Sequence, residues 1–396
     1  MLNRRTFLGK SSLLSLAPIA PAFLSRTAFA SKAGKDNRIL VVIELEGGND
    51  GLNTVIPFSD DHYAEYRKSL RIETKDVLKL SDSMGLHPAM KEAAELFDSG
   101  RLAVIPGVGY PNPSRSHFRS QAIWHSARMN TVDHNGHGWL GRTCDEARDP
   151  GSSRPDAVFV GDGAIPAAII GRRTNSIALN NENELELASS LELPEDRIKG
   201  DDLSAFVRHT VTSSYDAAKR FSESNHVNSS NGDGPYPNDG FARKLRLLSR
   251  IIRIGGGTRV FYVSLRGFDT HSAQAFSHER LLRQYSRALK AFLDDMRSHK
   301  LSDQITVLTF SEFGRQLREN ASAGTDHGTC GPVFIAGDAI KPGILSAYPS
   351  LTDLENDEMK STVDFRTIYA SLLEDWLGTE SMGPLGGSFK PLPVVV

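Results

Sequence analysis

The chain has 396 residues, and a predicted signal peptide at residues 1–30 accounts for four basic residues and no acids. Without that segment, 42 basic residues face 48 acidic ones. This mild acidity argues against nucleic acid or anionic lipid as the main partner. Residues 31–396 are long enough to bury a large core, and we expect a single α/β domain.

The first thirty residues predict export. Arg4 and Arg5 form a twin-arginine motif, an apolar stretch follows, and residues 28–30 supply the small side chains that a signal peptidase requires. The segment is too short for a stable membrane span, and no later stretch is long enough for a transmembrane helix. A retained amphipathic anchor is the alternative. We therefore expect the twin-arginine export machinery as a partner, a periplasmic or otherwise exported location, and a metal loaded in the cytoplasm.

The chain contains only two cysteines, Cys144 and Cys330. This number excludes a zinc site built from thiolates. In an oxidising compartment the two could pair, but their spacing does not require it. Two separate buried thiols fit the sequence equally well.

Apolar stretches and amphipathic patterns alternate along the chain. Strands are predicted at Arg38–Leu45, Leu102–Val108, Arg259–Leu265, Ile305–Phe310 and Pro332–Ala336, and further strands or edge pieces at Ala157–Val160 and Ala167–Ile170. Helices are predicted at Ala89–Ser99, from Ser116 to about Arg128, at Phe276–His299 and at Asp364–Leu377, the last ended by Gly378. The strand-helix-strand order from 259 to 310 implies parallel pairing.

Two regions depart from this alternation. Residues 62–80 are polar and predict irregular structure. From about 181 to 253 the pattern becomes charged and helical, with an interruption rich in Asn, Ser, Gly and Pro at 226–240. We interpret this second region as a helical insertion with a loop in its middle.

Acids and histidines gather where the predicted strands end. They are Asp50, Asp269, His271, Glu312, Asp326 and His327. Sites in open α/β sheets lie at such strand ends. Asp269 and His271 are two residues apart, so in an extended segment they project to the same side, which suits two ligands of one cation. Four of the six are carboxylates, which favours one or two divalent ions such as zinc, calcium, magnesium or manganese. Loop caps and ion pairs are the structural alternative.

A serine and two arginines complete the candidate chemistry. Ser116 stands at a predicted helix start, where a serine either caps the helix or accompanies a bound anion. Arg115 and Arg315 could fork onto a tetrahedral oxyanion. With a divalent ion, these groups are the parts that phosphoryl or sulfuryl transfer needs. His134 and His137, in a Gly- and Asn-rich loop, could also bind metal, although a solvated loop is the simpler interpretation.

Seven motifs occur in a fixed order along the chain. They are GGNDGLN (47–53), LHPAM (86–90), PSRSHF (113–118), GWLGR (138–142), FDTH (268–271), FSEFGR (310–315) and GTDHG (324–328). This ordered set resembles the bacterial exported family called domain of unknown function 1501, over nearly the whole mature chain. More distantly it resembles the alkaline phosphatase and sulfatase superfamily. The resemblance implies a mostly parallel central sheet flanked by helices, with metals at the carboxyl ends of the strands.

The resemblance also implies roles for single residues. Asp50 matches the first-strand metal aspartate of the superfamily, and Ser116, or else Ser114, falls near its nucleophile. The ligands of one metal are matched by Asp269, His271 and His327. Phe313, which follows Glu312, stands where the superfamily has a histidine ligand of a second metal, and a phenylalanine cannot bind one.

Together these features predict an exported, metal-dependent hydrolase of phosphate or sulfate esters that acts on a small-molecule or polymeric ester. The alternative is a non-catalytic periplasmic binding or assembly protein that kept the fold. Acyl hydrolysis by Ser116 is disfavoured, because the Gly-x-Ser-x-Gly elbow is absent.

Overall fold

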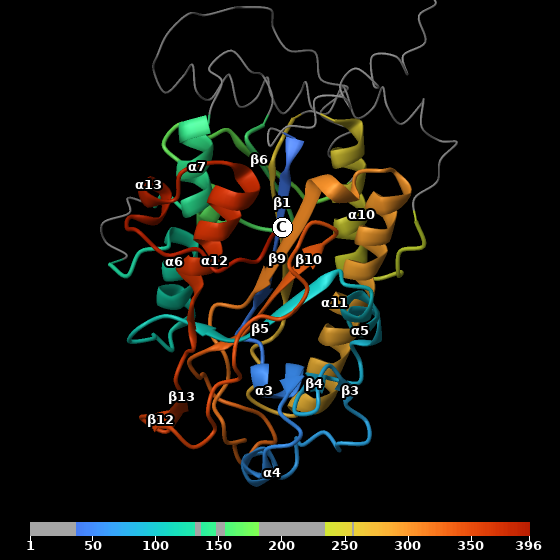
Figure 1. The fold of residues 1–396 in the computed structure, drawn as a ribbon, viewed down its shortest axis with the longest axis vertical. Coiled ribbons are helices and arrows are strands. Elements are labelled where there is room, and N and C mark those ends of the chain that lie inside the picture. The colour runs from blue at the N-terminus through green and yellow to red at the C-terminus, as the bar shows by residue number, and fades with distance from the viewer. Residues whose placement is uncertain (1–36, 131–135, 148–154, 182–233, 256) are drawn as a thin grey trace, which may run out of the picture. The chain divides into compact units, whose positions relative to one another are not determined.

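The computed structural model describes residues 37–130, 136–147, 155–181, 234–255 and 257–396. A nine-stranded sheet lies at the centre of these residues, with strand order β11-β5-β10-β9-β1-β8-β6-β7 and β14 beside β5 (Figure 1). Its strands are β1 (Ile39–Glu46), β5 (Leu102–Gly109), β6 (Ala157–Val160), β7 (Ser176–Leu179), β8 (Val260–Arg266), β9 (Ile305–Phe310), β10 (Gly331–Gly337), β11 (Gly343–Ile344) and β14 (Val363–Asp364). Strand β10 is antiparallel to β5 and β9, and the other described pairings are parallel. The predicted α/β fold with a mostly parallel sheet is confirmed.

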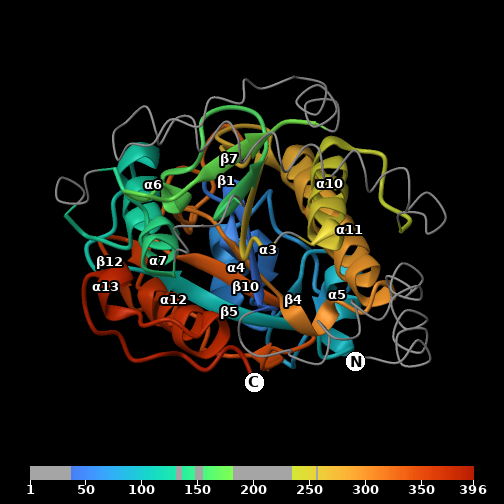
Figure 2. The same ribbon diagram turned by 90° about the horizontal axis from the view of Figure 1, so that it is seen from above.

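Strand β1 shows why helices cover both faces of the sheet. Its residues are almost all apolar, and successive side chains point to opposite faces. Val41 and Ile43 belong to the core under one helical layer, whereas Leu40 and Val42 belong to the core under the other. Figure 2 shows the two layers on either side of the sheet. One contains α5 (Lys91–Asp98), α10 (Gly240–Ile254) and α11 (Gln274–Ser298), and the other contains α6 (His117–Ser126), α7 (Trp139–Ala147) and α12 (Phe365–Ser371).

The register around β1 gathers three loops at one edge. Strands β8 and β9 are joined through α11 and run parallel, as predicted, but β1 lies between them and pairs with both. Glu46 is opposite Arg266 on β8, and Glu44 is opposite Phe310 on β9. The chain therefore leaves all three strands side by side, and the loops that follow them can share one site.

Smaller elements decorate the sheet. They are α3 (Gly51–Thr54), β2 (Val55–Ile56), α4 (Asp61–Tyr66), β3 (Leu78–Lys79), β4 (Gly85–Leu86), η3 (Ala167–Ile169), η4 (Ser302–Gln304), β12 (Leu354–Glu355), β13 (Glu358–Met359), η5 (Leu372–Leu377) and α13 (Met382–Leu385). No helix in the described ranges combines the length and apolar character needed to cross a bilayer.

Three predicted elements differ in detail. The segment 167–170, predicted as a strand, forms the 3-10 turn η3, closed by hydrogen bonds from Ile169 N to Pro166 O and from Ile170 N to Ala167 O. The helix predicted at 364–377 is α helical up to Ser371 and continues as the π-helical turn η5 before Gly378 ends it in the left-handed conformation. The polar stretch 62–80 contains most of the short helix α4.

Two further predictions concern residues that the structure describes only in part or not at all. The predicted signal peptide at 1–30 lies outside the described residues, and so do residues 182–233 of the predicted insertion. The helix α10 confirms the helical character of the last part of that region. Within the described chain both cysteines are free and buried, and burial raises the pKa of the Cys330 thiol to about 12. Separate buried thiols are therefore the correct alternative.

Candidate metal centre

The loop after β1 turns back over its own strand through two glycines. Gly47 and Gly48 have φ angles of +116° and +77°, which side chains other than hydrogen rarely tolerate. A Cβ atom on Gly48 would lie 2.3 Å from the ring of Phe313. Because Gly48 has no side chain, the ring of Phe313, in the loop after β9, can pack directly on the backbone of the loop after β1.

Arg315 ties the loops together. Its Nε donates to Gly48 O at 2.7 Å, its Nη1 to Thr325 O at 2.8 Å, and its Nη2 to Phe268 O at 2.9 Å and to Asp269 Oδ1 at 2.7 Å. The side chain is completely buried. Arg315 is therefore an internal anchor in the structure, whereas the sequence predicted that it binds a substrate oxyanion.

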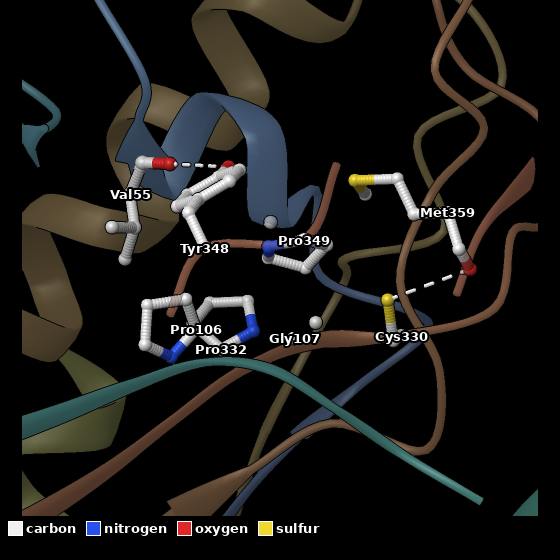
Figure 3. Close-up of a pocket in the computed structure, with 10 residues that line it drawn as sticks. Val55, Pro106, Gly107, Cys330, Pro332, Tyr348, Pro349 and Met359 are labelled. Atoms are coloured by element: carbon white, nitrogen blue, oxygen red, sulfur yellow. Dashed lines mark hydrogen bonds between the residues drawn. The ribbon is translucent and has the colours of Figure 1, made fainter. Parts of the chain in front are cut away.

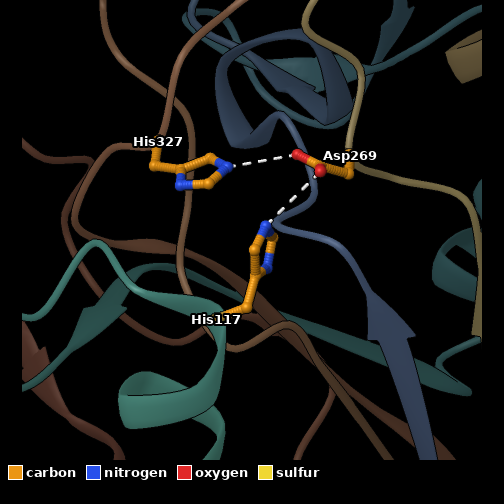
Figure 4. Close-up of side chains that lie close together, drawn as sticks. All are labelled: His117, Asp269 and His327. Carbon is orange, nitrogen blue, oxygen red and sulfur yellow. Dashed lines mark hydrogen bonds and ion pairs between the residues drawn. The ribbon is translucent and has the colours of Figure 1, made fainter.

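Four side chains from three segments lie beside this anchor, and Figure 4 shows three of them: His117, Asp269 and His327. The Nε2 atoms of His271 and His327 lie 2.9 Å apart, and each is 3.1 Å from Asp269 Oδ1. The Nε2 atom of His117, at the start of α6, lies 3.5 Å from Asp269 Oδ2. The predicted trio of Asp269, His271 and His327 is thus brought together, and His117 joins it.

Each histidine in this cluster is held through its Nδ1 atom. The oxygen atoms that face the three Nδ1 atoms, each at 2.8 Å, are Asp326 Oδ1 for His271, Arg115 O for His327 and Glu312 Oε1 for His117. A carbonyl or carboxylate oxygen only accepts hydrogen bonds, so Nδ1 carries the proton in each case. In a neutral imidazole the Nε2 atom then presents a bare lone pair, as a metal-ligating histidine does.

The spacing of these atoms fits a divalent cation. Ligand atoms at zinc distances of about 2.0–2.1 Å around a tetrahedron are separated by roughly 3.3 Å. The separations of 2.9–3.1 Å among Asp269, His271 and His327 are close to this value. Two lone pairs that face each other at 2.9 Å repel unless a proton lies between them or a cation to one side binds both.

Asp269 supplies the negative charge at the centre of the cluster. Its partial burial raises the pKa of its carboxyl group, but the hydrogen bond and the positive charge of Arg315 outweigh this effect and hold the pKa at about 2. Asp269 is therefore ionised at any physiological pH. Asp326 is also held ionised, because the hydrogen bond from His271 lowers the pKa of its carboxyl group.

Asp50 is engaged elsewhere. Arg67 Nη1 donates to Asp50 Oδ2 at 2.6 Å and Arg67 Nη2 to Asp50 Oδ1 at 2.8 Å, and neither side chain is exposed. Gln274 Nε2 also donates to Asp50 Oδ2. Both oxygens are thus occupied, and the structure does not bring Asp50 to the cluster as a ligand. Arg67, in the polar stretch 62–80, gave no sequence signal of this role.

Glu312 and Phe313 support the histidines from behind. Glu312 is buried and its carboxylate accepts hydrogen bonds from Gly47 N at 3.0 Å and Ser311 Oγ at 3.1 Å in addition to the contact with His117. The ring of Phe313 packs 4.8 Å from the ring of His117 and 4.7 Å from that of His327. Glu312 therefore faces His117, although the sequence predicted it as a direct metal ligand.

Ser116 and Arg115 are exposed and directly precede His117 of the cluster in the chain. Ser116 is the N-cap residue of α6, yet its side chain makes no capping hydrogen bond to the described residues. Arg115 lies 3.4 Å from Glu358, whose pKa is raised to about 7 by burial. Near neutral pH Glu358 is thus only partly ionised and holds Arg115 weakly. The hydroxyl of Ser116 and the guanidinium of Arg115 are both available to a ligand.

His117 is the residue that sequence reasoning passed over. It stands next to Ser116 in the PSRSHF motif, and neither the motif nor the family resemblance marked it as a metal ligand. Its position at a helix start that follows a strand end was the available signal. Of the alternative loop, His134 falls outside the described residues, and His137 is not among the residues grouped around Asp269.

A small pocket beside β5 and β10 is separate from the cluster (Figure 3). Its lining is mainly apolar: Gly51, Val55, Pro106, Gly107, Cys330, Gly331, Pro332, Tyr348, Pro349 and Met359. The hydroxyl of Tyr348 is used internally, because it donates to Val55 O at 2.8 Å. The lining contains neither an acid nor a histidine, so this pocket is a packing feature next to the fold's proline-rich turns.

Several solved structures are similar to this chain at low sequence identity. The lipoteichoic acid synthase LtaP from Listeria monocytogenes is 10% identical with a TM-score of 0.41, over 91% of this chain and 76% of that one. A protein in the alkaline phosphatase superfamily from Vibrio parahaemolyticus is 11% identical with a TM-score of 0.41, over 89% and 69%. The C-terminal periplasmic domain of EcEptC from Escherichia coli, in complex with Zn, is 11% identical with a TM-score of 0.36, over 78% and 74%. These similarities are too partial to assign a reaction.

No curated protein matches the sequence. A family model does match it, over residues 37–379, which include every member of the cluster. The family that the ordered motifs indicated is therefore confirmed. The chain belongs to the family described as "Protein of unknown function (DUF1501)".

Proposed function

We propose that the protein is an exported hydrolase of phosphate or sulfate esters that uses one divalent cation held by Asp269, His271 and His327. The convergence of bare Nε2 atoms on an ionised carboxylate carries this proposal. Imidazole ligands favour zinc over calcium and magnesium, which prefer oxygen ligands. A bound divalent cation supplies Lewis-acid chemistry, because it polarises the ester oxygen and activates the attacking group.

The surroundings of the cluster favour one cation over two. Asp50, the predicted ligand of a second cation, is neutralised by Arg67. Phe313 places an apolar ring where the superfamily pattern has another histidine, and this ring packs against His117 and His327.

Arg115 is the arginine that can reach an anionic substrate. Arg315 is buried and saturated by backbone and carboxylate acceptors, whereas the side chain of Arg115 is 42% exposed. The raised pKa of Glu358 weakens its ion pair with Arg115. The guanidinium can therefore donate two hydrogen bonds to an ester oxyanion. The side chain of Asp269 is 49% exposed, so an ester can approach the cluster from solvent.

The proposal is tested on protein purified through its native export route without added metal. Elemental analysis is expected to find about one divalent ion per chain, with zinc as the expected element. A panel of phosphate and sulfate esters is then screened, and chelator treatment is expected to remove any activity found while readdition of zinc restores it. A protein that carries no divalent ion contradicts the proposal.

Ser116→Ala is expected to abolish turnover of any ester that is hydrolysed while the cation stays bound. A serine hydroxyl is a weak nucleophile until a cation or a base activates it. The side chain of Ser116 makes no capping hydrogen bond within the described chain, and Ser116 directly precedes His117. Ser114→Ala is the matched control and should retain activity. If Ser116→Ala keeps the full rate, a water molecule attacks directly and Ser116 is not the nucleophile.

Export is expected to depend on the arginine pair. Replacing Arg4 and Arg5 by lysine should leave full-length precursor in the cytoplasm, because a receptor reads the motif and charge alone is not sufficient. Cell fractionation followed by immunoblotting measures the result. Normal processing and normal location of the double variant would remove the basis for the exported location.

The second candidate, a non-catalytic binding or assembly protein, is favoured by one observation. Asp50 and Arg315, two groups predicted to act on the substrate or on a second cation, are both buried in internal contacts. In that case the cluster would bind a cation for structure or for ligand recognition. Stoichiometric metal without hydrolysis of any ester in the panel would favour this second function.

A further inference from the structure

We infer that His117 also binds the cation, together with Asp269 and His327, and that Glu312 is the carboxylate that orients it, so that α6 carries part of the metal centre. This inference rests on the proposed cation at Asp269, His271 and His327. It changes the predicted role of Glu312 from a metal ligand to a support for one.

The Nε2 atom of His117 has the environment of a ligand that faces a cation. It is buried and makes no hydrogen bond to a described residue. It faces Asp269 Oδ2 at 3.5 Å, whereas His271 and His327 face the other oxygen, Oδ1. The rings of His117 and His327 meet edge to face with centroids 4.4 Å apart. Because buried polar atoms rarely lack a partner, a nitrogen without a hydrogen bond that faces a carboxylate indicates that a cation or a proton lies beside it.

Glu312 cannot turn to the cation itself. Its carboxylate already accepts from Gly47 N, Ser311 Oγ and His117 Nδ1, and its side chain is 2% exposed. These donors stabilise the charged form of the carboxylate and fix its position. A carboxylate that accepts from the outer nitrogen of a histidine sets the tautomer and direction of the metal-binding nitrogen.

The same face of α6 is attached to Glu312 a second time. Ser120, three residues after His117, donates from Oγ to Glu312 O at 2.5 Å. Residues three apart on a helix share one face, so both contacts hold the first turn against the loop after β9. The orientation of the His117 ring is therefore set by two contacts to one residue.

The far end of α6 is fixed by a buried acid in the middle of β1. Glu44 accepts from Gln121 Nε2 at 3.0 Å and from Tyr262 OH at 2.6 Å, and it lies 3.1 Å from His125 Nε2. Both ends of this ten-residue helix are thus attached to strands or strand-end loops. This double attachment preorganises His117 before a cation arrives.

The test measures zinc affinity by competition with a chromogenic chelator. It compares the wild type with His117→Ala, Glu312→Gln and His62→Ala. His117→Ala is expected to raise the zinc Kd by at least about 100-fold, and Glu312→Gln by roughly 10- to 100-fold. The matched control is His62→Ala, since His62 also contacts a carboxylate, Asp60, at 2.9 Å but lies outside the cluster. His62→Ala should keep the wild-type Kd.

A second readout does not depend on affinity. Cobalt(II) replaces zinc, and its visible d–d bands are expected to shift in His117→Ala, because an imidazole ligand is lost, and to stay unchanged in His62→Ala. Thermal melting of the metal-free proteins shows whether each variant folds. His117 is partly exposed, so its alanine variant remains informative even if Glu312→Gln unfolds.

The failures of the two proposals are distinguishable. A folded His117→Ala with a zinc Kd within about threefold of wild type and an unchanged cobalt spectrum overturns the ligand role of His117. If His271→Ala/His327→Ala still loses the cation in that case, the proposed function stands without His117. If that double variant also binds zinc like the wild type, the proposed centre itself fails.

Discussion

Replacing His271 and His327 together by alanine is expected to lower the bound cation to background. The two Nε2 atoms lie 2.9 Å apart, and both face Asp269 Oδ1. The double variant leaves one carboxylate and one imidazole, which is too few protein ligands for a zinc site. Elemental analysis of protein purified without added metal measures the loss.

The fold should survive this double substitution. The side chains of His271 and His327 are 43% and 22% exposed, and they lie in loops outside the two main cores. Circular dichroism and the midpoint of thermal unfolding of the metal-free protein provide the control. Unchanged metal content in a folded double variant would show that the cluster is not the centre, and the loop of His134 and His137 would be the next candidate.

Arg67→Met is expected to destabilise the protein by about 3–5 kcal/mol, because it leaves the carboxylate of Asp50 buried without a countercharge. Both side chains of this pair are completely buried, and two hydrogen bonds join them. Urea denaturation followed by circular dichroism measures the change in the free energy of unfolding. Replacing both partners, as in Asp50→Asn/Arg67→Met, should recover part of the loss, because the unpaired charge is then removed as well.

The same pair separates a structural role of Asp50 from a metal-binding one. Asp50→Asn is expected to reduce stability while the cation content stays at the wild-type level, because the Arg67 guanidinium already occupies both oxygens. A variant that loses its cation and keeps its stability would return Asp50 to the ligand set that the sequence resemblance implied.

The strands of the sheet could be predicted because their signal is local. The run Ile305–Phe310 is entirely buried and coincides with β9, and Ala157–Val160 coincides with β6. The segment 167–170 is apolar too, but Pro166 precedes it and the chain closes into a turn there. Hydrophobicity alone cannot distinguish a short strand from a buried turn.

The site could be predicted only in part, because charge partners are chosen by loops that meet in three dimensions. The spacing of Asp269 and His271 was sufficient to predict that their side chains meet, and His271 Nε2 lies 3.1 Å from Asp269 Oδ1. The sequence distance between Asp50 and Arg67, or between Glu312 and His117, contains no such information. Asp50 and Glu312 each follow a strand, so both were candidate metal ligands. Their partners, Arg67 for Asp50 and His117 for Glu312, come from other segments that only the folded structure brings close.

The cluster is assembled from both halves of the chain, with His117 in the first half and Asp269, His271 and His327 in the second. His327 lies four residues before the start of β10, which pairs with β9, and β9 pairs with β1. A nascent chain therefore lacks the complete set of ligands until its last third has been synthesised and those strands have joined. In the proposed centre, capture of the cation is therefore a late event, and an occupied centre reports a finished sheet. If the Arg4–Arg5 motif exports the folded chain, the supply of metal ions on the side of the membrane where folding ends selects the cation.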